Sequence, residues 1–164
     1  MTEAVSASFF LSDEASTITL GHKLAPFLGP GMVVWLRGDL GAGKTTIARA
    51  ILRALGHTGA VKSPTFTLVE VYVVSSLYLY HLDLYRFNAP REFEEAGLGE
   101  YFEKDAVCLV EWPEKAADFL PPADIELFLC LAGESRKARL SARGERGYKC
   151  LNALRKAFKS TAAR

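Results

Sequence analysis

A glycine-rich segment that ends in a lysine and two threonines could hold a phosphate group. Residues 37–52 read RGDLGAGKTTIARAIL, and Gly38, Gly43, Lys44 and Thr45 match the pattern G-x-x-x-x-G-K-[ST]. Glycines let the backbone curl around phosphate with its N–H groups pointing inward, and a following helix adds its positive end. The lysine supplies a charge for the outer phosphates, and the threonine hydroxyl is placed to ligate Mg²⁺. The pattern therefore predicts nucleotide binding.

The stretch His81–Arg86, HLDLYR, offers a carboxylate for such a site. As a strand it alternates, so that His81, Asp83 and Tyr85 face one side and the two leucines face the other. The solvated face of an amphipathic strand would give the same pattern. The functional interpretation places Asp83 beside the Mg²⁺, because a P-loop site needs a carboxylate as well as its own threonine.

A second carboxylate closes the apolar run Val107–Trp112, VCLVEW. A buried strand that ends in an acid has the form of a Walker B element, which sets a carboxylate at the carboxyl end of the sheet near the metal. Glu111 is long enough to ligate Mg²⁺, often through water, or to orient an attacking water. Trp112 packs against the nucleotide site, offers a surface to a partner, or completes the edge of the core. The residues alone leave these alternatives open.

Two further segments are candidates for contact with a nucleotide. In residues 62–70, KSPTFTLVE, Thr65 lies at the entrance of a strand, where many P-loop proteins keep a nucleotide-sensing segment. Because Pro64 biases its neighbour towards extended geometry, the same letters also suit a simple turn. Residues 133–149 carry six basic and two acidic side chains. A solvated hairpin explains this run, and the alternatives are an arginine reaching the nucleotide or a small patch facing RNA, with Arg136 and Arg139 as the candidates.

Strands and helices must bring these residues together, and the hydrophobic pattern supplies them. Apolar runs between glycines are typical of strands buried on both faces, and helical spacing follows the glycine-rich loop. Ser12 is placed to cap the first helix. Alternating elements predict a single α/β domain over residues 1–164, with a frayed tail at 160–164. We expect helices over residues 11–28, 45–56, 90–105 and 147–160, and strands over 31–38, 65–74, 76–87, 106–112, 124–133 and 136–144.

The composition excludes several classes of protein. The 164 residues carry a net charge of +1, so no overall field steers the chain towards nucleic acid or an anionic membrane. Three widely spaced cysteines without a CxxC pair indicate buried free thiols in a reducing compartment. The N-terminal segment lacks signal-peptide character, and no apolar run reaches the ~18 residues that span a bilayer. We expect a cytoplasmic protein with no membrane partner.

Four motifs, GDLGAGKTT, KSPTFTLVE, YHLDLYRF and CLVEWPE, in this order and spacing closely resemble the TsaE (YjeE) family. Its members are bacterial ATPases required for threonylcarbamoyladenosine (t6A) formation in tRNA. The resemblance runs from about Phe10 to the segment LPPADIEL. It implies a P-loop NTPase-like α/β fold with a central mixed, mostly parallel β-sheet flanked by helices. It also implies Mg²⁺-dependent hydrolysis of ATP to ADP, weak in isolation, and association with the TsaD–TsaB complex, through which tRNA is reached indirectly.

The resemblance also implies roles for individual residues. Lys44, Asp83 and Glu111 would be catalytic, and Thr45 would join Asp83 and Glu111 in serving Mg²⁺. One N-terminal contact, from the segment SDEAST, and one C-terminal contact, from the basic segment, would complete the nucleotide site. The implied nucleotide-binding residues are Glu14, Gly38, Leu40, Gly41, Ala42, Gly43, Lys44, Thr45, Thr46, Thr65 and Arg136.

The leading hypothesis is an ATPase that energises or resets a tRNA-modifying complex without performing the transfer itself. A small-molecule kinase is the alternative, because P-loops of this size are common in such enzymes. No sizeable inserted lid lies between the loop and Glu111, which disfavours that alternative. A GTPase-like switch would usually show an N/T-K-x-D element, and FEKDAV does not supply it. Direct binding of tRNA is a separate hypothesis that depends on the basic segment alone.

Overall fold

Strands and helices alternate along the chain, as the sequence predicts. The computed structural model describes residues 5–103 and 105–162. Of the expected tail at 160–164, residues 160–162 lie in the last helix, and residues 163–164 lie outside the described part. The strands are β1 (Val5–Leu11), β2 (Val33–Gly38), β3 (Val69–Val74), β4 (Leu77–Asp83), β5 (Ala106–Glu111), β6 (Ile125–Ala132) and β7 (Ser135–Ala142). The helices are α1 (Glu14–Leu24), α2 (Lys44–Ala54), α3 (Glu92–Glu95) and α4 (Gly144–Ala162), with 3₁₀ turns η1 (Ala25–Phe27), η2 (Leu98–Glu103) and η3 (Pro113–Lys115).

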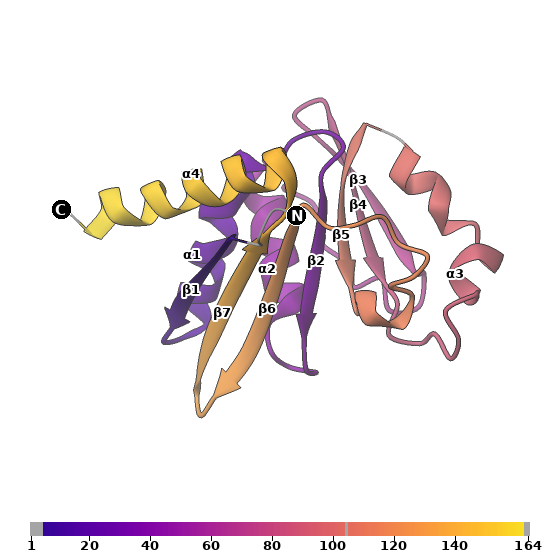
Figure 1. Cartoon of the computed structure of the whole chain (residues 1–164), viewed down its shortest axis with the longest axis horizontal. Helices are drawn as coiled ribbons and strands as arrows, with labels where there is room; N and C mark the ends of the chain where they lie inside the picture. Colours follow the sequence, from indigo (N-terminus) through magenta and orange to yellow (C-terminus); the bar gives the residue numbers. More distant parts are fainter. Residues whose placement is uncertain (1–4, 104, 163–164) are drawn as a thin grey trace.

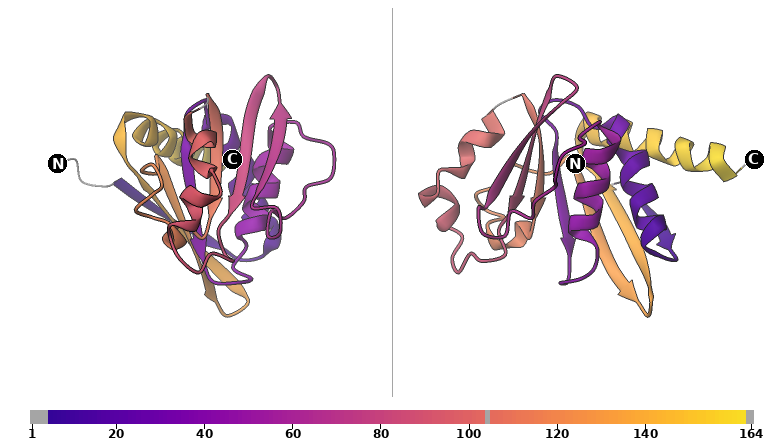
Figure 2. Two further views of the ribbon diagram at one scale, coloured as in Figure 1. Left: turned by 90° about the vertical axis from the view of Figure 1, so that its right-hand side faces the viewer. Right: turned by 180° about the vertical axis from the view of Figure 1, so that it is seen from behind.

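All seven strands form one sheet, in the order β1-β7-β6-β2-β5-β4-β3 (Figure 1). Parallel pairing joins the four central strands β6, β2, β5 and β4. Antiparallel pairing adds β7 and β1 on one side and β3 on the other. Helices α1 and α2 lie together against one face (Figure 2). The predicted α/β class, with a mixed central sheet flanked by helices, is confirmed.

The sheet buries apolar side chains on both of its faces, and β5 shows this most clearly. Val107 and Leu109 belong to a core shared with α1, α2 and α4, whereas Cys108 and Val110 belong to a second core that includes Phe93 of α3. Successive residues of a strand point to opposite faces, so a strand buried on both sides reads as an unbroken apolar run. That is why the sequence predicts β5 and β2 as buried strands.

The N-cap of helix α1 lies one residue later in the chain than predicted. The N-cap is Asp13, whose backbone is extended (φ −153°, ψ 179°) and whose Oδ1 accepts a hydrogen bond from the Ser16 amide at 2.8 Å. The prediction of Ser12 as the cap is therefore wrong. Asp13 can reach the free amide because it directly precedes the first helical residue, Glu14, and its carboxylate also suits the positive end of the helix.

Strand β1 is absent from the sequence prediction, which assigns no helix or strand before residue 11. Its pairing partner is β7, in the register Val5↔Ala142 to Leu11↔Arg136, so the contacts that define it come from the far end of the chain. By contrast, the turn between β3 and β4 is set by residues that are neighbours in the chain. Ser75 and Ser76 both have positive φ, at 48° and 66°, as a tight two-residue hairpin requires.

The segment predicted as one helix over residues 90–105 is two short pieces, α3 and η2. Gly97 separates them with a φ of +69°, a conformation that ends helical propagation. Among the described residues, no helix is long and apolar enough to cross a membrane.

The three cysteines are free, but they are not all buried as expected. Burial raises the pKa of the Cys108 thiol to about 12 and that of Cys150 to about 11, so both are protonated and unreactive at neutral pH. Cys130 is exposed although it lies in an apolar run of β6. The reason is that its side chain points to the outer face of β6, away from the first core.

Candidate functional site

The glycine-rich loop connects the end of β2 to the start of α2. Gly38, Gly41 and Gly43 have φ values of +141°, +80° and +110°, which other residues rarely adopt. A side chain at Gly38 would also collide with the carbonyl oxygen of Leu129 on the neighbouring strand β6. The loop is thus a strand–turn–helix element whose glycines are required by backbone geometry. Helix α2 begins at Lys44, so its free amides face the loop.

Lys44 is buried at the centre of this loop, with 5% of its surface exposed. Its Nζ donates hydrogen bonds to the carbonyl oxygens of Gly38 and Asp39, and it lies 4.2 Å from the centre of the Trp112 ring. Burial lowers the pKa of Lys44, while nearby acids, with Glu111 first, oppose that shift. The cation is therefore held in place by the loop backbone and an aromatic face.

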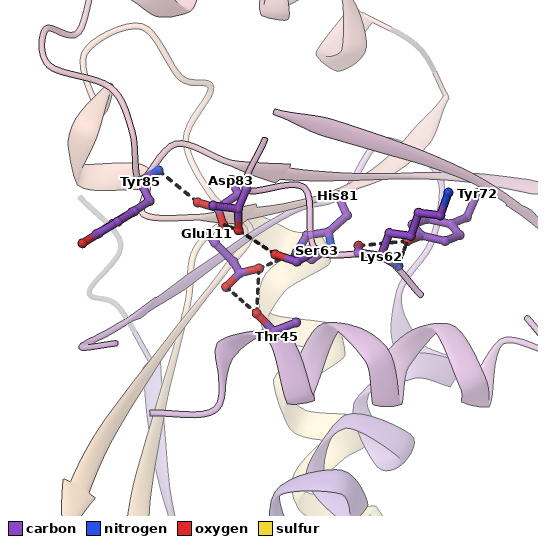
Figure 3. A network of polar contacts seen from close by, with 9 residues as sticks. Thr45, Lys62, Ser63, Tyr72, His81, Asp83, Tyr85 and Glu111 are labelled. Carbon is purple, nitrogen blue, oxygen red and sulfur yellow. Dashed lines mark hydrogen bonds and ion pairs between the residues drawn. The ribbon is translucent and has the colours of Figure 1, made fainter. Parts of the chain in front are cut away.

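The two predicted carboxylates lie side by side at the carboxyl ends of neighbouring parallel strands. Asp83 closes β4, Glu111 closes β5, and the strand register pairs them directly. They are 6% and 3% exposed. The Thr45 hydroxyl donates to Glu111 Oε1 at 3.2 Å and also lies 3.4 Å from Oε2. The sheet thus brings both predicted acids close to Thr45 in the first turn of α2 (Figure 3).

Asp83 is also connected to the segment predicted to sense the nucleotide. Its Oδ2 accepts a hydrogen bond from the Thr65 hydroxyl at 3.4 Å, and its Oδ1 accepts one from the Tyr85 amide at 2.9 Å. Burial raises the pKa of Asp83, and the charge of Glu111 adds to that rise, while the Tyr85 amide opposes it. The interpretation of this strand face as solvated is wrong for His81 and Asp83, which are buried on the face that carries Leu79 of the first core. Only Tyr85, after the end of β4, is exposed.

His81 is a site residue to which the sequence alone assigns no role. It is completely buried, and its Nε2 donates to Glu111 Oε2 at 2.6 Å (Figure 3). Its Nδ1 is buried and has no hydrogen-bond partner in the described structure. A carboxylate only accepts hydrogen bonds, so Nε2 is the donor in this contact. His81 therefore fixes the orientation of Glu111. The HLDLYR alternation already places His81 on the Asp83 face, and that was the available signal.

Arg136, which the resemblance implies as a nucleotide contact, reaches the backbone of the glycine-rich loop from β7. Its Nε donates to the Ala42 carbonyl at 2.8 Å, and its Nη2 donates to the Gly41 carbonyl at 3.0 Å. These contacts attach β7 to the loop. Arg139 lies outside this site, on the outer face of the sheet. Of the two arginines considered, only Arg136 meets the loop.

A cavity of about 570 Å³ gathers most of the predicted residues. Gly38 and Ala42 do not line it, although both form the loop. Thr17, Ser63, Tyr85 and Trp112 line it without having been predicted as nucleotide contacts. For Trp112, packing against the site is one of the alternatives that the sequence leaves open. Its predicted lining residues are Glu14, Leu40, Gly41, Gly43, Lys44, Thr45, Thr46, Thr65, Asp83, Glu111 and Arg136.

The oxygen donors at one end of the cavity fit Mg²⁺ chemistry. Mg²⁺ is usually held by one or two carboxylates together with water and substrate phosphates, and P-loop sites add a Ser or Thr hydroxyl. Asp83, Glu111 and Thr45 are such a set, next to a helix N-terminus that suits phosphate. The described residues contain no cluster of three or more His, Cys, Asp or Glu that would hold a metal by itself. The donors therefore suit a metal that is shared with a phosphate group.

The fold and this loop place the chain among the P-loop NTPase-like α/β proteins. A family model described as "Threonylcarbamoyl adenosine biosynthesis protein TsaE" matches residues 11–139. The tRNA threonylcarbamoyladenosine biosynthesis protein TsaE of Haemophilus influenzae is 41% identical over 150 residues, covering 88% of this chain and 95% of that protein. The Bacillus subtilis protein of the same name is 43% identical over 131 residues, covering 79% and 82%.

A solved structure agrees with these sequence matches. The crystal structure of Bacillus subtilis YdiB superposes with a TM-score of 0.83 at 32% identity, covering 96% of this chain and 99% of that one. The chain belongs to the TsaE family.

Proposed function

We propose that this protein is a Mg²⁺-dependent ATPase that serves the t6A modification of tRNA. The observation that carries the proposal is the contact of Glu111 with Thr45, beside Asp83, at the entrance to the P-loop helix. A site that hydrolyses a nucleotide needs groups for phosphate, metal and water in one place. The place of the reaction in t6A synthesis comes from the family and from the names of its relatives.

Two sets of residues would act on a bound nucleotide: one set binds its phosphates, and the other holds Mg²⁺ and positions water. The amides of the loop and of the first turn of α2 bind the phosphate oxygens, and Lys44 neutralises charge on the outer ones. Thr45 and Glu111 would hold the Mg²⁺, which supplies further charge neutralisation when bound. Asp83 would orient a water or the metal's water shell, and both acids are nearly buried in the wall of the cavity.

We further propose that the TsaD–TsaB complex controls turnover and that tRNA is reached through that complex. The protein would energise or reset the complex rather than transfer the threonylcarbamoyl group. The decisive experiment measures ATP turnover of the full chain alone, with TsaD–TsaB, and with TsaD–TsaB and tRNA. We expect weak turnover alone, stimulation by the complex, and free phosphate as the product.

Two results would contradict this proposal. If a small metabolite rather than water received the phosphate, the protein would be a kinase. If cells carrying Lys44→Ala kept normal t6A in their tRNA, nucleotide use by this protein would not be required for the modification. Thr19→Ala is a suitable control in the same cells, because Thr19 is an exposed residue of α1 that donates to the Ala15 carbonyl at 3.0 Å and does not line the cavity.

A further inference from the structure

The outer face of β1, β7 and β6 carries exposed aromatic and basic side chains that the proposed ATPase does not use. Paired residues on adjacent strands share a face, so the register shows which side chains are neighbours. Phe10 is 66% exposed and Phe128 is 43% exposed, which is unusual for phenylalanine inside strands. Read from β1 through β7 to β6, the two neighbouring rows are Phe10, Lys137, Cys130 and Ser8, Arg139, Phe128.

This face is open, although the other face of the same strands is covered. The alternate residues of β1 and β7, such as Phe9 and Leu140, pack into the first core. In Figure 1 the lower halves of β1, β7 and β6 lie in front of α1 and α2, and no described helix crosses in front of them. A shallow cavity of about 610 Å³ lies along the open side, bounded by Phe10, Phe128 and their neighbours.

The outer face is positively charged, because Glu126, the acidic residue of β6 on this face, is already paired with other arginines. Glu126 of β6 accepts a hydrogen bond from Arg37 at 2.6 Å and lies 4.0 Å from Arg143. The ion pairs found among the described residues do not include Lys137 or Arg139, and both side chains are exposed. Two uncompensated cations therefore lie between two exposed aromatic rings.

We propose that this face binds single-stranded RNA. Proteins recognise unpaired RNA by stacking bases on aromatic side chains while Lys and Arg contact the phosphates. Here Phe10 and Phe128 would stack bases, and Lys137 and Arg139, which lie between them on β7, would meet the connecting backbone. One unpaired RNA strand supplies both kinds of partner at a regular spacing, bases for the rings and phosphates for the cations. The surface is separate from the nucleotide cavity, which none of these four residues lines.

The first experiment measures binding of a short, labelled, single-stranded RNA of mixed sequence to the full chain by fluorescence anisotropy. Phe10→Ser and Phe128→Ser should each weaken binding about tenfold, as loss of one stacked base does. Lys137→Ala and Arg139→Ala should each lower the slope of log affinity against log salt by about 0.7. The matched controls, Phe119→Ala on another surface and Lys156→Ala on α4, should change neither quantity.

A second experiment locates the RNA without changing the face. Cys130 is exposed within the proposed surface, whereas Cys108 and Cys150 are buried, so a maleimide should label Cys130 selectively. Bound RNA should slow that labelling in proportion to the fraction of protein bound. The proposal is overturned if RNA does not bind at low salt, if Cys130 is not protected, or if the Phe10→Ser/Phe128→Ser double variant binds RNA normally.

The remaining outcomes separate this proposal from the neighbouring ones. If the double variant loses its association with TsaD–TsaB while the unchanged chain does not bind RNA, the face is a protein interface and the RNA proposal is wrong. Turnover of ATP by the double variant, measured alone, should equal that of the unchanged chain, since the nucleotide cavity is intact. A failed ATPase proposal would appear in Lys44→Ala instead, with RNA binding unaffected.

Discussion

Glu111 and Asp83 differ in the groups that hold them. Glu111 accepts hydrogen bonds from Thr45 and His81, whereas Asp83 accepts them from the Tyr85 amide and Thr65. The threonine of a P-loop is a metal ligand, so these contacts favour Glu111 as its partner at the metal. Asp83 is instead coupled to the segment that carries Thr65. At the scale of single residues, the two acids therefore predict different mutant behaviour.

Replacing Glu111 with Gln should reduce ATP turnover about 10²- to 10³-fold, because a group that stabilises the transferring phosphate through its metal is lost. Nucleotide binding should remain within a few-fold, since the loop and Lys44 are untouched. Single-turnover hydrolysis and equilibrium titration with a fluorescent nucleotide measure the two effects separately. Glu95→Gln, an exposed glutamate on α3, is the matched control. Loss of binding with normal turnover would contradict the assigned role.

Replacing His81 with Leu should raise the Mg²⁺ concentration needed for nucleotide binding and lower turnover, each about 10-fold. Groups that orient a metal ligand typically contribute 10- to 100-fold in affinity or activity. His81→Gln should recover part of the loss, because its amide N–H can still donate to Glu111. Thermal unfolding of both variants provides the control for folding. Equal defects in the Leu and Gln variants at equal stability would show that the hydrogen bond is not what matters.

The raised pKa of Asp83 predicts a stability effect with a definite sign. The folded state holds the Asp83 proton to higher pH than the unfolded state does. Stability from this group is therefore greatest below the ordinary Asp pKa of about 3.9 and falls as pH rises towards the raised value. Without nucleotide, Asp83→Asn should raise the Tm at neutral pH, by roughly 2–4 °C for each kcal/mol that the buried charge costs. Calorimetry should show the difference vanishing near pH 3. A Tm lowered at neutral pH would contradict this.

At the scale of elements, the site depends on local features that can be tested separately. The cap of α1 is one of them, because α1 carries Glu14 and Thr17 into the cavity. Hydrogen bonds from the Ser16 side chain and amide lower the pKa of Asp13, so this cap stabilises the fold above the ordinary Asp pKa and is lost as pH falls through the lowered value.

Asp13→Ala should therefore lower the urea midpoint at pH 7, and the loss should shrink in acid. Ser12→Ala is the natural control, since Ser12 precedes the cap and its hydroxyl meets only Ser16 Oγ, at 3.2 Å. Equilibrium unfolding of the two variants in urea at pH 7 and pH 3 checks this. Equal midpoints for both variants at pH 7 would contradict the assignment of Asp13 as the cap.

Features set by neighbours in sequence could be predicted, whereas features set by distant pairing could not. The glycine-rich loop, the apolar run of β5 and the Ser75–Ser76 turn are each legible within a dozen residues. Strand β1 exists because β7 pairs with it, and no local periodicity reports that. The His81–Glu111 contact likewise arises from the pairing of β4 with β5. The same limit explains Cys130, whose exposure depends on which face of β6 is covered.

At the scale of the whole molecule, the two ends of the described chain stabilise each other. The rings of Phe9 in β1 and Phe158 in α4 lie 4.7 Å apart, and Arg155 of α4 donates to the Ser6 carbonyl. These contacts close the sheet edge that carries β1. We therefore expect β1 and α4 to unfold together. None of the described residues of β1 lines the nucleotide cavity, but β1 pairs with β7, which carries Arg136 to it.

A double-mutant cycle on Phe9 and Phe158 should give a coupling of about 0.5–1.5 kcal/mol, as aromatic pairs do. Phe9→Ala and Phe158→Ala, alone and combined, would be compared by urea unfolding. Phe9 combined with the distant Phe119 is the control pair, and its effects should add. A coupling near zero for Phe9 and Phe158 would show that the two ends fold independently.

Strand β7 presents consecutive side chains to opposite surfaces, and this has a thermodynamic consequence. Arg136 contacts the carbonyls of the P-loop, while Lys137, the next residue, belongs to the outer face. A ligand that shifts this strand on one surface must also change the energy of the other surface. Linkage is reciprocal: if nucleotide alters the affinity of the outer face by some factor, whatever binds there alters nucleotide affinity by the same factor. One strand would then let each surface report the occupancy of the other.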